Sequence, residues 1–565
     1  MPSKEQFIKD LVSRMTLEQK VGGCITFEFC GTRITPNEHR KINDYQVAGL
    51  RTTPHIFTEE PYGSRHDASG AVTQRLAPYA TADQYAEILS ELQEMAGRRP
   101  LSIPLHICSD QEGDLSCDIV RGGVNIFPSA MGMGATDDPD LVYRAYKAVA
   151  RQQRAIGVTQ LHSPCLDVNI NPKNPEICTR SFGDDTERVI AFGHALVKAF
   201  AEEGIISTGK HFPGRGDSAV DVHFDLDYNK ASRKRLDEVE LAPYRALIAE
   251  GLACIMTAHT MYEALDPDGI PASVSRMITH ELIRNDLGFD GLVTTDAMGM
   301  GGVAKKFSTY GEACAAAIAA GADLVLAKTH AENQQQVFDW IMRFVREGKI
   351  PMEELDEHNR RVLCAKWDTG LFDKHLADPK KVLEVIRDPG IRRLSEEVAL
   401  KACVLKHDRG GVLPLSPDRK IFVTDQHYAL WQNKGEDLYY HTTQLQKFVM
   451  EQTRNFAYWE TELEPTDQDE KTCLELAADC EVAVVYSHYW RGNPTNTDLA
   501  RKLKAAGKKL VVIAGAPYDV VCPQEADAVL VTFAGTPRSM EAACRILFGK
   551  DSPGGKWPLK LVPQN

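Results

Sequence analysis

Between residues 20 and 330, short apolar runs rich in β-branched residues alternate with longer stretches of helical pattern. The runs are residues 21–27, 47–53, 104–110, 159–168, 206–212, 253–260, 291–298 and 322–328. The intervening stretches 138–157 and 187–204 have the apolar spacing of amphipathic helices. Eight strands that alternate with helices predict a parallel (β/α)8 barrel of the TIM type.

A second α/β region follows a polar, proline-containing break near residues 375–395. It contains four continuous apolar runs, at 421–425, 481–490, 508–519 and 528–535. Such runs are typical of strands buried on both faces of a sheet that helices cover on each side. We therefore expect a TIM-barrel domain at 1–375, a linker at 376–395 and a smaller α/β sandwich domain at 396–565.

Composition excludes some classes of partner. The net charge is −14 over 565 residues, which argues against a nucleic-acid partner because phosphate binding needs basic patches. The chain has no 18-residue apolar run and no apolar signal core near its first residue, so we expect a cytoplasmic protein without a membrane segment.

The 14 cysteines do not indicate a metal centre or a disulfide framework. Cys165, Cys254 and Cys314 lie inside apolar runs, and the pairs that are close in sequence lack CxxC spacing. We interpret them as small buried apolar side chains and expect no bound metal.

Polar residues gather at the ends of the predicted barrel strands. They are Asp110, Asp167, Lys210, His211, His259, Asp296 and Lys328. Active sites of such barrels lie at the carboxyl ends of the strands, so this pattern predicts a functional site there. The long segment 54–83 follows the second strand, and we expect it to lie over the same barrel mouth.

The segment KHFPGRGDSAVDVH (210–223) is the densest motif. Lys210 and His211 end a strand, and the glycines and proline that follow favour a loop. Asp221 and His223 stand two residues apart, so the carboxylate can orient the imidazole as a general acid/base. A solvated loop can contain such a triplet by chance, and the spacing alone does not decide between the two interpretations.

The segment GFDGLVTTDAMGM (288–300) delivers Asp296 to the end of an apolar strand. An ionised carboxylate there can act as a covalent nucleophile at an anomeric carbon. Lys210, Arg121 and Arg180 are candidate cations to keep it charged. The alternative is an aspartate that merely caps the next helix.

Together these segments resemble glycoside hydrolase family 3, in its β-N-acetylglucosaminidase branch. The resemblance rests on MTLEQKVGG (15–23), SDQEGD (109–114), LDVNINPKNPEICTRSFGDD (166–185), KHFPGRGDSAVDVH (210–223), VTTDAMGM (293–300) and SEEVALKACVLKHDRGGVLPL (395–415). It implies that Asp296 is the nucleophile and that His223, oriented by Asp221, is the acid/base. It also implies sugar binding by Asp110, Arg121, Arg180, Lys210 and His211.

The same resemblance implies a retaining exo-β-glycosidase that needs no metal or organic cofactor. Its small saccharide substrate would carry terminal β-linked N-acetylglucosamine, as in peptidoglycan or chitin fragments, and a homodimer is compatible with the sequence. Arg215 and Val222 depart from the branch pattern, which leaves the exact substrate open.

Four alternatives are weighed. A glycoside phosphorylase is favoured by a histidine acid, which leaves no fixed negative charge to repel phosphate, and by Arg215 as a phosphate partner. A β-glucosidase with relaxed sugar choice and a non-catalytic sugar-binding protein are two others. A barrel aldolase or isomerase is compatible with the fold alone, but the ordered motifs count against it.

Overall fold

The computed structural model describes nearly the whole chain. The described residues are 3–54, 80–120, 122–220, 227–300, 303, 306–426, 444–462, 464–489 and 495–564. The predicted mouth loop 54–83 lies largely outside this set, as do Arg121, Asp221 and His223.

Eight parallel strands form the first domain. They are β1 (Ile25–Cys30), β2 (Gly49–Thr53), β3 (His106–Ser109), β4 (Gln160–Leu161), β5 (Ile206–Phe212), β7 (Cys254–Thr257), β9 (Leu292–Thr295) and β10 (Val325–Ala327). They pair in the order β10-β1-β2-β3-β4-β5-β7-β9. A parallel bridge between Thr294 and Leu324 joins the two ends of the sheet and closes the barrel. Each predicted run overlaps one of these strands, and the predicted TIM-type barrel is confirmed.

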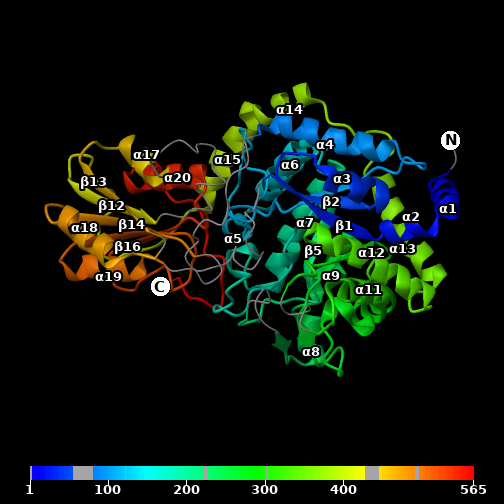
Figure 1. Cartoon of the computed structure of the whole chain (residues 1–565). Helices are drawn as coiled ribbons and strands as arrows, with labels where there is room; N and C mark the ends of the chain where they lie inside the picture. Colours follow the sequence, from blue (N-terminus) through cyan, green and yellow to red (C-terminus); the bar gives the residue numbers. More distant parts are fainter. Residues whose placement is uncertain are drawn as a thin grey trace.

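Helices surround the barrel (Figure 1). They include α4 (Ala82–Gly97), α6 (Pro139–Ile156), α7 (Thr186–Glu202), α9 (Ala242–Ala249), α11 (Tyr310–Ala320), α12 (Ala331–Arg346) and α13 (Met352–Asp368). The α6 helix illustrates why they form where they do. Asp138 caps its start by accepting a hydrogen bond from the backbone of Leu141, Pro139 occupies the first turn, and Gly157 ends it at a positive φ of 109°.

The second domain is a six-stranded sheet between two layers of helices. Its strands are β11 (Val404–Asp408), β12 (Ile421–Gln426), β13 (Phe456–Thr461), β14 (Val482–Ser487), β15 (Lys509–Ala514) and β16 (Ala528–Val531). All pair in parallel except β11, which is antiparallel to β16. Along β14, Ala483 and Val485 enter one core while Val482 and Val484 enter another, so both faces are buried. The predicted sandwich is confirmed, although β11 and β13 were not among the predicted strands.

The segment between the domains is helical. It forms α14 (Pro379–Ile386) and the start of α15 (Pro389–Ala402). The α14 helix lies along α4 at the side of the barrel (Figure 1), where Val382 and Ile386 join the barrel's apolar core. The predicted linker 376–395 therefore corresponds to packed helices, and α15 runs across its predicted end.

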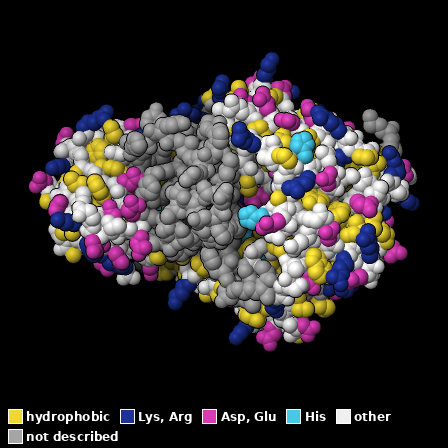
Figure 2. Space-filling model, viewed as in Figure 1, with side chains coloured by type: hydrophobic (Ala, Val, Ile, Leu, Met, Phe, Trp, Pro, Cys, Tyr) yellow, Lys and Arg dark blue, Asp and Glu magenta, His cyan; other side chains and the backbone are white. Residues whose placement is uncertain are grey.

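The surface mixes charges of both signs. On the face shown in Figure 2, basic and acidic side chains are interspersed over both domains. No helix among the described residues has the length and apolarity needed to span a bilayer. All fourteen cysteines lie in described positions as free thiols, and most are buried, as the sequence led us to expect.

Candidate active site

Asp296 follows directly after β9 at the carboxyl end of the barrel. Its backbone N–H donates to the Thr257 carbonyl on β7 at 3.0 Å, and its Oδ1 accepts a hydrogen bond from the backbone of Ala297 at 2.7 Å. His259 lies beside this turn, with Nε2 3.1 Å from the Ala297 carbonyl and Nδ1 2.8 Å from Ser273 Oγ. These contacts fix the turn, and the Asp296 side chain remains 16% exposed.

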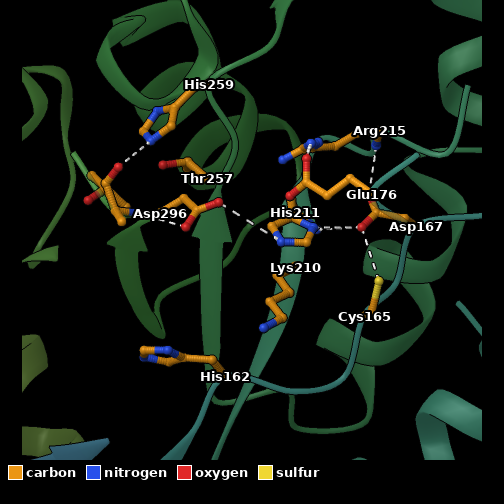
Figure 3. A network of polar contacts seen from close by, with 12 residues as sticks. His162, Cys165, Asp167, Glu176, Lys210, His211, Arg215, Thr257, His259 and Asp296 are labelled. Atoms are coloured by element: carbon orange, nitrogen blue, oxygen red, sulfur yellow. Dashed lines mark hydrogen bonds and ion pairs between the residues drawn. The ribbon is translucent and has the colours of Figure 1, made fainter. Parts of the chain in front are cut away.

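His211, at the end of β5, lies between Asp167 and Asp296 (Figure 3). Its Nδ1 is 2.7 Å from Asp167 Oδ2, and its Nε2 is 4.0 Å from Asp296 Oδ2. Arg180 Nη2 lies 3.3 Å from the same Nε2. An ionised carboxylate only accepts hydrogen bonds and a guanidinium only donates them, so the proton sits on Nδ1 and Nε2 accepts from Arg180. The ring is therefore a neutral imidazole.

Burial alone would raise the pKa of Asp167, but its interaction with His211, whose Nδ1 donates a hydrogen bond to it, and then with Arg215 outweighs burial and lowers the pKa.

Asp110, after β3, lies beside two cations and a buried histidine. Lys210 Nζ is 3.0 Å from its Oδ1, Arg51 pairs with its Oδ2, and His162 Nδ1 is 3.6 Å away. Burial opposes ionisation, but Lys210 and Arg51 outweigh it and hold the Asp110 pKa well below its usual range. The side chain is still 25% exposed. It can therefore accept hydrogen bonds from sugar hydroxyls as a fixed anion.

Arg180 and Lys210 form a buried layer behind these carboxylates. Arg180 Nε and Nη2 donate to the two oxygens of Glu112 at 3.0 and 3.1 Å, in a bidentate pair. Lys210 Nζ lies 2.7 Å from the same carboxylate. Both cations are almost wholly buried, so they set the geometry and charge around these carboxylates.

Arg215 anchors the first part of the loop that follows β5. Its backbone N–H donates to Asp167 Oδ1 at 2.6 Å, and its guanidinium, fully buried, pairs with Glu176. Gly216 passes so close to the Val168 carbonyl that a Cβ would lie 1.7 Å from that oxygen, so only glycine fits there. The charge of Asp296 contributes to a raised Arg215 pKa, after the larger effects of burial, which lowers it, and of Glu176 and Asp167, which raise it. Arg215 is therefore a cation within electrostatic range of Asp296.

Two family models match the chain over nearly its whole length. The glycosyl hydrolase family 3 N-terminal domain matches residues 16–365, and the family 3 C-terminal domain matches residues 402–564. The chain belongs to glycosyl hydrolase family 3. The family resemblance inferred from the motifs is confirmed.

Individual relatives carry related names. A β-N-acetylglucosaminidase/β-glucosidase of Cellulomonas fimi is 32% identical over 356 residues, 61% of this chain and 61% of that protein. A β-hexosaminidase A of Pseudoalteromonas piscicida is 31% identical over 428 residues, 72% of this chain and 70% of that protein. The structure of a family 3 β-N-acetylglucosaminidase from Paenibacillus superposes with a TM-score of 0.83 at 28% identity, covering 97% of this chain and 99% of that one.

Five of the residues predicted for a family 3 site lie in described positions, and the structure brings them together at one end of the barrel. They are Asp110, Arg180, Lys210, His211 and Asp296. Arg121, Asp221 and His223 lie outside the described residues, so their roles stay predictions. Lys210 and Arg180 pair with Glu112, and Arg215, which we had not considered for that task, is a further cation within electrostatic range of Asp296.

Several supporting residues escaped the sequence analysis. Glu112 lies inside the SDQEGD motif, and Glu176 lies inside the 166–185 segment, but neither was given a role. Arg51 is the one charged residue within the β2 run GLRTT, which was a usable signal because a buried arginine needs a carboxylate partner.

Among the described residues, one group could in principle hold a metal ion. The ligand atoms of Cys165, Asp167 and His211 lie within 4.8 Å of one another and are buried. In the structure, Asp167 Oδ2 accepts hydrogen bonds from both Cys165 Sγ, at 3.1 Å, and His211 Nδ1. These contacts account for the cluster without an ion.

Proposed function

We propose that this family 3 protein is a retaining exo-β-glycosidase that hydrolyses terminal β-linked N-acetylglucosamine. The observation that carries the proposal is Asp296, a partly exposed carboxylate fixed at the mouth of the barrel beside His211 and within the field of Arg215. A carboxylate in this setting can attack an anomeric carbon and form a covalent glycosyl-enzyme.

The reaction proceeds by double displacement. Asp296 attacks the anomeric carbon while His223 protonates the departing glycosidic oxygen, and Asp221 orients the His223 ring. Water then attacks the glycosyl-enzyme, and His223 takes its proton as general base. Asp110 accepts hydrogen bonds from sugar hydroxyls, with Arg180, Lys210 and His211 behind the sugar. These steps use no metal or organic cofactor.

The choice of N-acetylglucosamine is supported by the names of the relatives from Cellulomonas fimi, Pseudoalteromonas piscicida and Paenibacillus. The first name also includes β-glucosidase, so glucosides are the second sugar to test. Fragments of peptidoglycan or chitin are the proposed substrates. A cytoplasmic location and a homodimer stay predictions.

Hydrolysis is favoured over phosphorolysis by the position of Arg215. This residue was the proposed phosphate partner, but its guanidinium is buried and paired with Glu176. A guanidinium buried in this way cannot donate hydrogen bonds to a phosphate ion in solvent.

The test combines a substrate screen with product stereochemistry. Para-nitrophenyl β-glycosides of N-acetylglucosamine, glucose and xylose are assayed with and without phosphate. We expect the highest kcat/KM for the N-acetylglucosaminide and no acceleration by phosphate. Proton NMR of early product should show the β-anomer before mutarotation, because attack inverts the anomeric carbon twice. Initial release of the α-anomer would exclude Asp296 as a nucleophile, and phosphate-dependent turnover would establish phosphorolysis.

A further inference from the structure

Asp167 is a wholly buried carboxylate that lies one layer behind the residues predicted to meet the sugar. It follows β4 and accepts four hydrogen bonds, which come from two different parts of the site. The mechanism proposed above assigns it no task. A buried charge with this many donors is costly to desolvate, so its contacts are informative about what it holds in position.

The Oδ2 oxygen of Asp167 accepts two hydrogen bonds from His211. It accepts from the His211 backbone N–H at 3.2 Å and from the ring Nδ1 at 2.7 Å. These two bonds fix both the main chain and the ring of His211, so Nε2 must point toward Asp296. They also keep the proton on Nδ1, which leaves a lone pair on Nε2.

The Oδ1 oxygen of Asp167 binds the loop that follows β5. It accepts from the Arg215 backbone N–H at 2.6 Å. The same stretch is held by Tyr262, which donates to the Gly214 carbonyl at 2.7 Å, and by Asn174, which donates to the Arg215 carbonyl at 2.8 Å. Residues 214–216 thus form a fixed root for the loop.

We propose that Asp167 is a positioning residue that sets the His211 tautomer through one oxygen and the root of the β5 loop through the other. It touches neither the nucleophile nor the sugar, and it acts through His211 and Arg215. This positioning role rests on the proposed function only in the second experiment below, where enzymatic activity is what is measured. It requires a carboxylate, because an amide has one accepting oxygen and would turn an N–H group toward either His211 or Arg215, both of which donate.

The first experiment reads the tautomer without any substrate. Nitrogen-15 NMR of histidine-labelled protein separates a protonated from an unprotonated ring nitrogen, and the His211 signals are assigned by their loss in His211→Asn or His211→Gln. We expect a neutral ring with the proton on Nδ1 in the wild type, and loss of that state in Asp167→Ala, which removes both accepting oxygens. A wild-type ring protonated on Nε2 alone, or an unchanged ring in Asp167→Ala, would overturn the proposal.

The second experiment asks whether Asp167 acts through His211. Asp167→Asn should lower kcat/KM for an activated aryl glycoside by about 10²-fold, as expected when a reacting group is misplaced. In a His211→Ala background the same change should cost clearly less, since groups that act as a unit are not additive, and the remaining loss is the part that acts through Arg215. Equal losses in both backgrounds would show that Asp167 does not act through His211.

Asp323→Asn is the matched control, because Asp323 is also a buried, multiply bonded barrel carboxylate but lies at the opposite end, before β10. It should lower the melting temperature and leave kcat/KM within about twofold. If the wild type turns over no glycoside, the proposed function fails, and the NMR measurement still decides the role of Asp167.

Discussion

Asp296 projects from the end of β9 with one oxygen already engaged. Oδ1 accepts the hydrogen bond from Ala297, whereas Oδ2 is the oxygen that faces His211. Hydrogen bonding to Oδ1 fixes the plane of the carboxylate, so Oδ2 is the atom we expect to form the bond to the sugar. His211, Arg215 and Asp167 all lie on one side of Asp296 (Figure 3).

Asp296→Ala should abolish turnover and leave the fold intact, because a partly exposed side chain at a strand end contributes little to the core. A 2-fluoro glycoside that traps the intermediate should label Asp296, which peptide mass spectrometry would identify. Asp290→Ala is the control, since Asp290 precedes the same strand but forms exposed ion pairs with Arg360 and Arg361; its activity should be unchanged. A label on another residue would refute the assignment.

His223→Ala should slow glycosides with poor leaving groups by roughly 10²–10⁴-fold, the usual contribution of general acid catalysis. Activated aryl glycosides should lose far less in the first step, because their leaving groups need little protonation. Asp221→Asn should give a milder form of the same defect. Brønsted plots of kcat/KM against leaving-group pKa measure this, and equal losses for all leaving groups would remove His223 from the acid role.

The strands of the barrel could be predicted because each is an apolar run closed by a turn or a polar residue. The β11 and β13 strands lack such an apolar run and were not predicted. Three polar residues, Lys406, His407 and Asp408, fall within β11, and β13 is an edge strand whose side chains are mostly half-buried or exposed, Trp459 among them. Edge strands pack on one side only, so their sequences lack the continuous apolar character of central strands.

The site could be predicted where a residue ends a strand, as Asp110, Lys210 and Asp296 do. The pairing of Arg215 with Glu176 could not, because both lie in irregular segments 39 residues apart. Only the folded backbone brings these two side chains together. Because the sequence does not show this pairing, phosphate was considered as a partner for Arg215, whereas in the structure its partner is the Glu176 carboxylate.

The starts of β9 and β10 are joined by Asp323. Its Oδ2 accepts from Arg284 Nη2 at 2.7 Å and from the Val293 backbone at 2.8 Å, and its Oδ1 lies 2.8 Å from His358 Nδ1. Asp323→Asn should therefore lower the free energy of unfolding by about 3–5 kcal/mol, as removal of one member of a buried ionic network does.

The pH dependence of this effect follows from the Asp323 pKa. Burial would raise it, but Arg284 and then His358 outweigh burial and lower it from 3.8 to about 2. Because the pKa is lower in the folded state, the ionised Asp323 stabilises the fold at every pH above its unfolded-state pKa of about 3.8. This stabilisation is lost as the pH falls from about 3.8 toward the folded-state pKa of about 2. Urea unfolding should give a constant difference between wild type and Asp323→Asn above about pH 4 and a shrinking one below. A difference that grows in acid would contradict this account.

The two domains share a buried boundary. Met131, Ala135 and Cys178 of the barrel belong to the same apolar cluster as Val529, Val531 and Phe533 of the second sheet. Hydrogen bonds cross it as well: Asn169 donates to Tyr518 at 2.6 Å, and the Gly535 backbone donates to Asp114 at 2.9 Å. We therefore expect the two lobes of Figure 1 to behave as one body.

Asp184 ties the segment after α20 (Pro537–Leu547) to the barrel. It accepts hydrogen bonds from the backbones of Lys560, at 2.8 Å, and Leu561, at 2.7 Å. Asp184→Ala leaves the backbone N–H groups of Lys560 and Leu561 without an acceptor. Each N–H group that stays buried then lowers the stability of the segment by about 1–3 kcal/mol. Limited proteolysis should then cut near residues 555–562 sooner than in the wild type.

Lys556→Ala is the matched control, since it removes an exposed ion pair with Asp137 in the same segment. Such pairs contribute about 0–1 kcal/mol, so its cleavage rate should stay near that of the wild type. Equal protection of Asp184→Ala and the wild type would show that the segment is held by other contacts.

The order in which the ribosome makes this chain gives that boundary a further consequence. The barrel is synthesised first. Until the second sheet has been translated, Met131, Ala135 and Cys178 are exposed to solvent. Residues 555–562, which donate to Asp184 and Ala135, are synthesised only after every strand of the second sheet. A nascent barrel therefore carries an uncovered apolar patch until the second domain has been translated, and a message that stops before that point would release a protein prone to self-association.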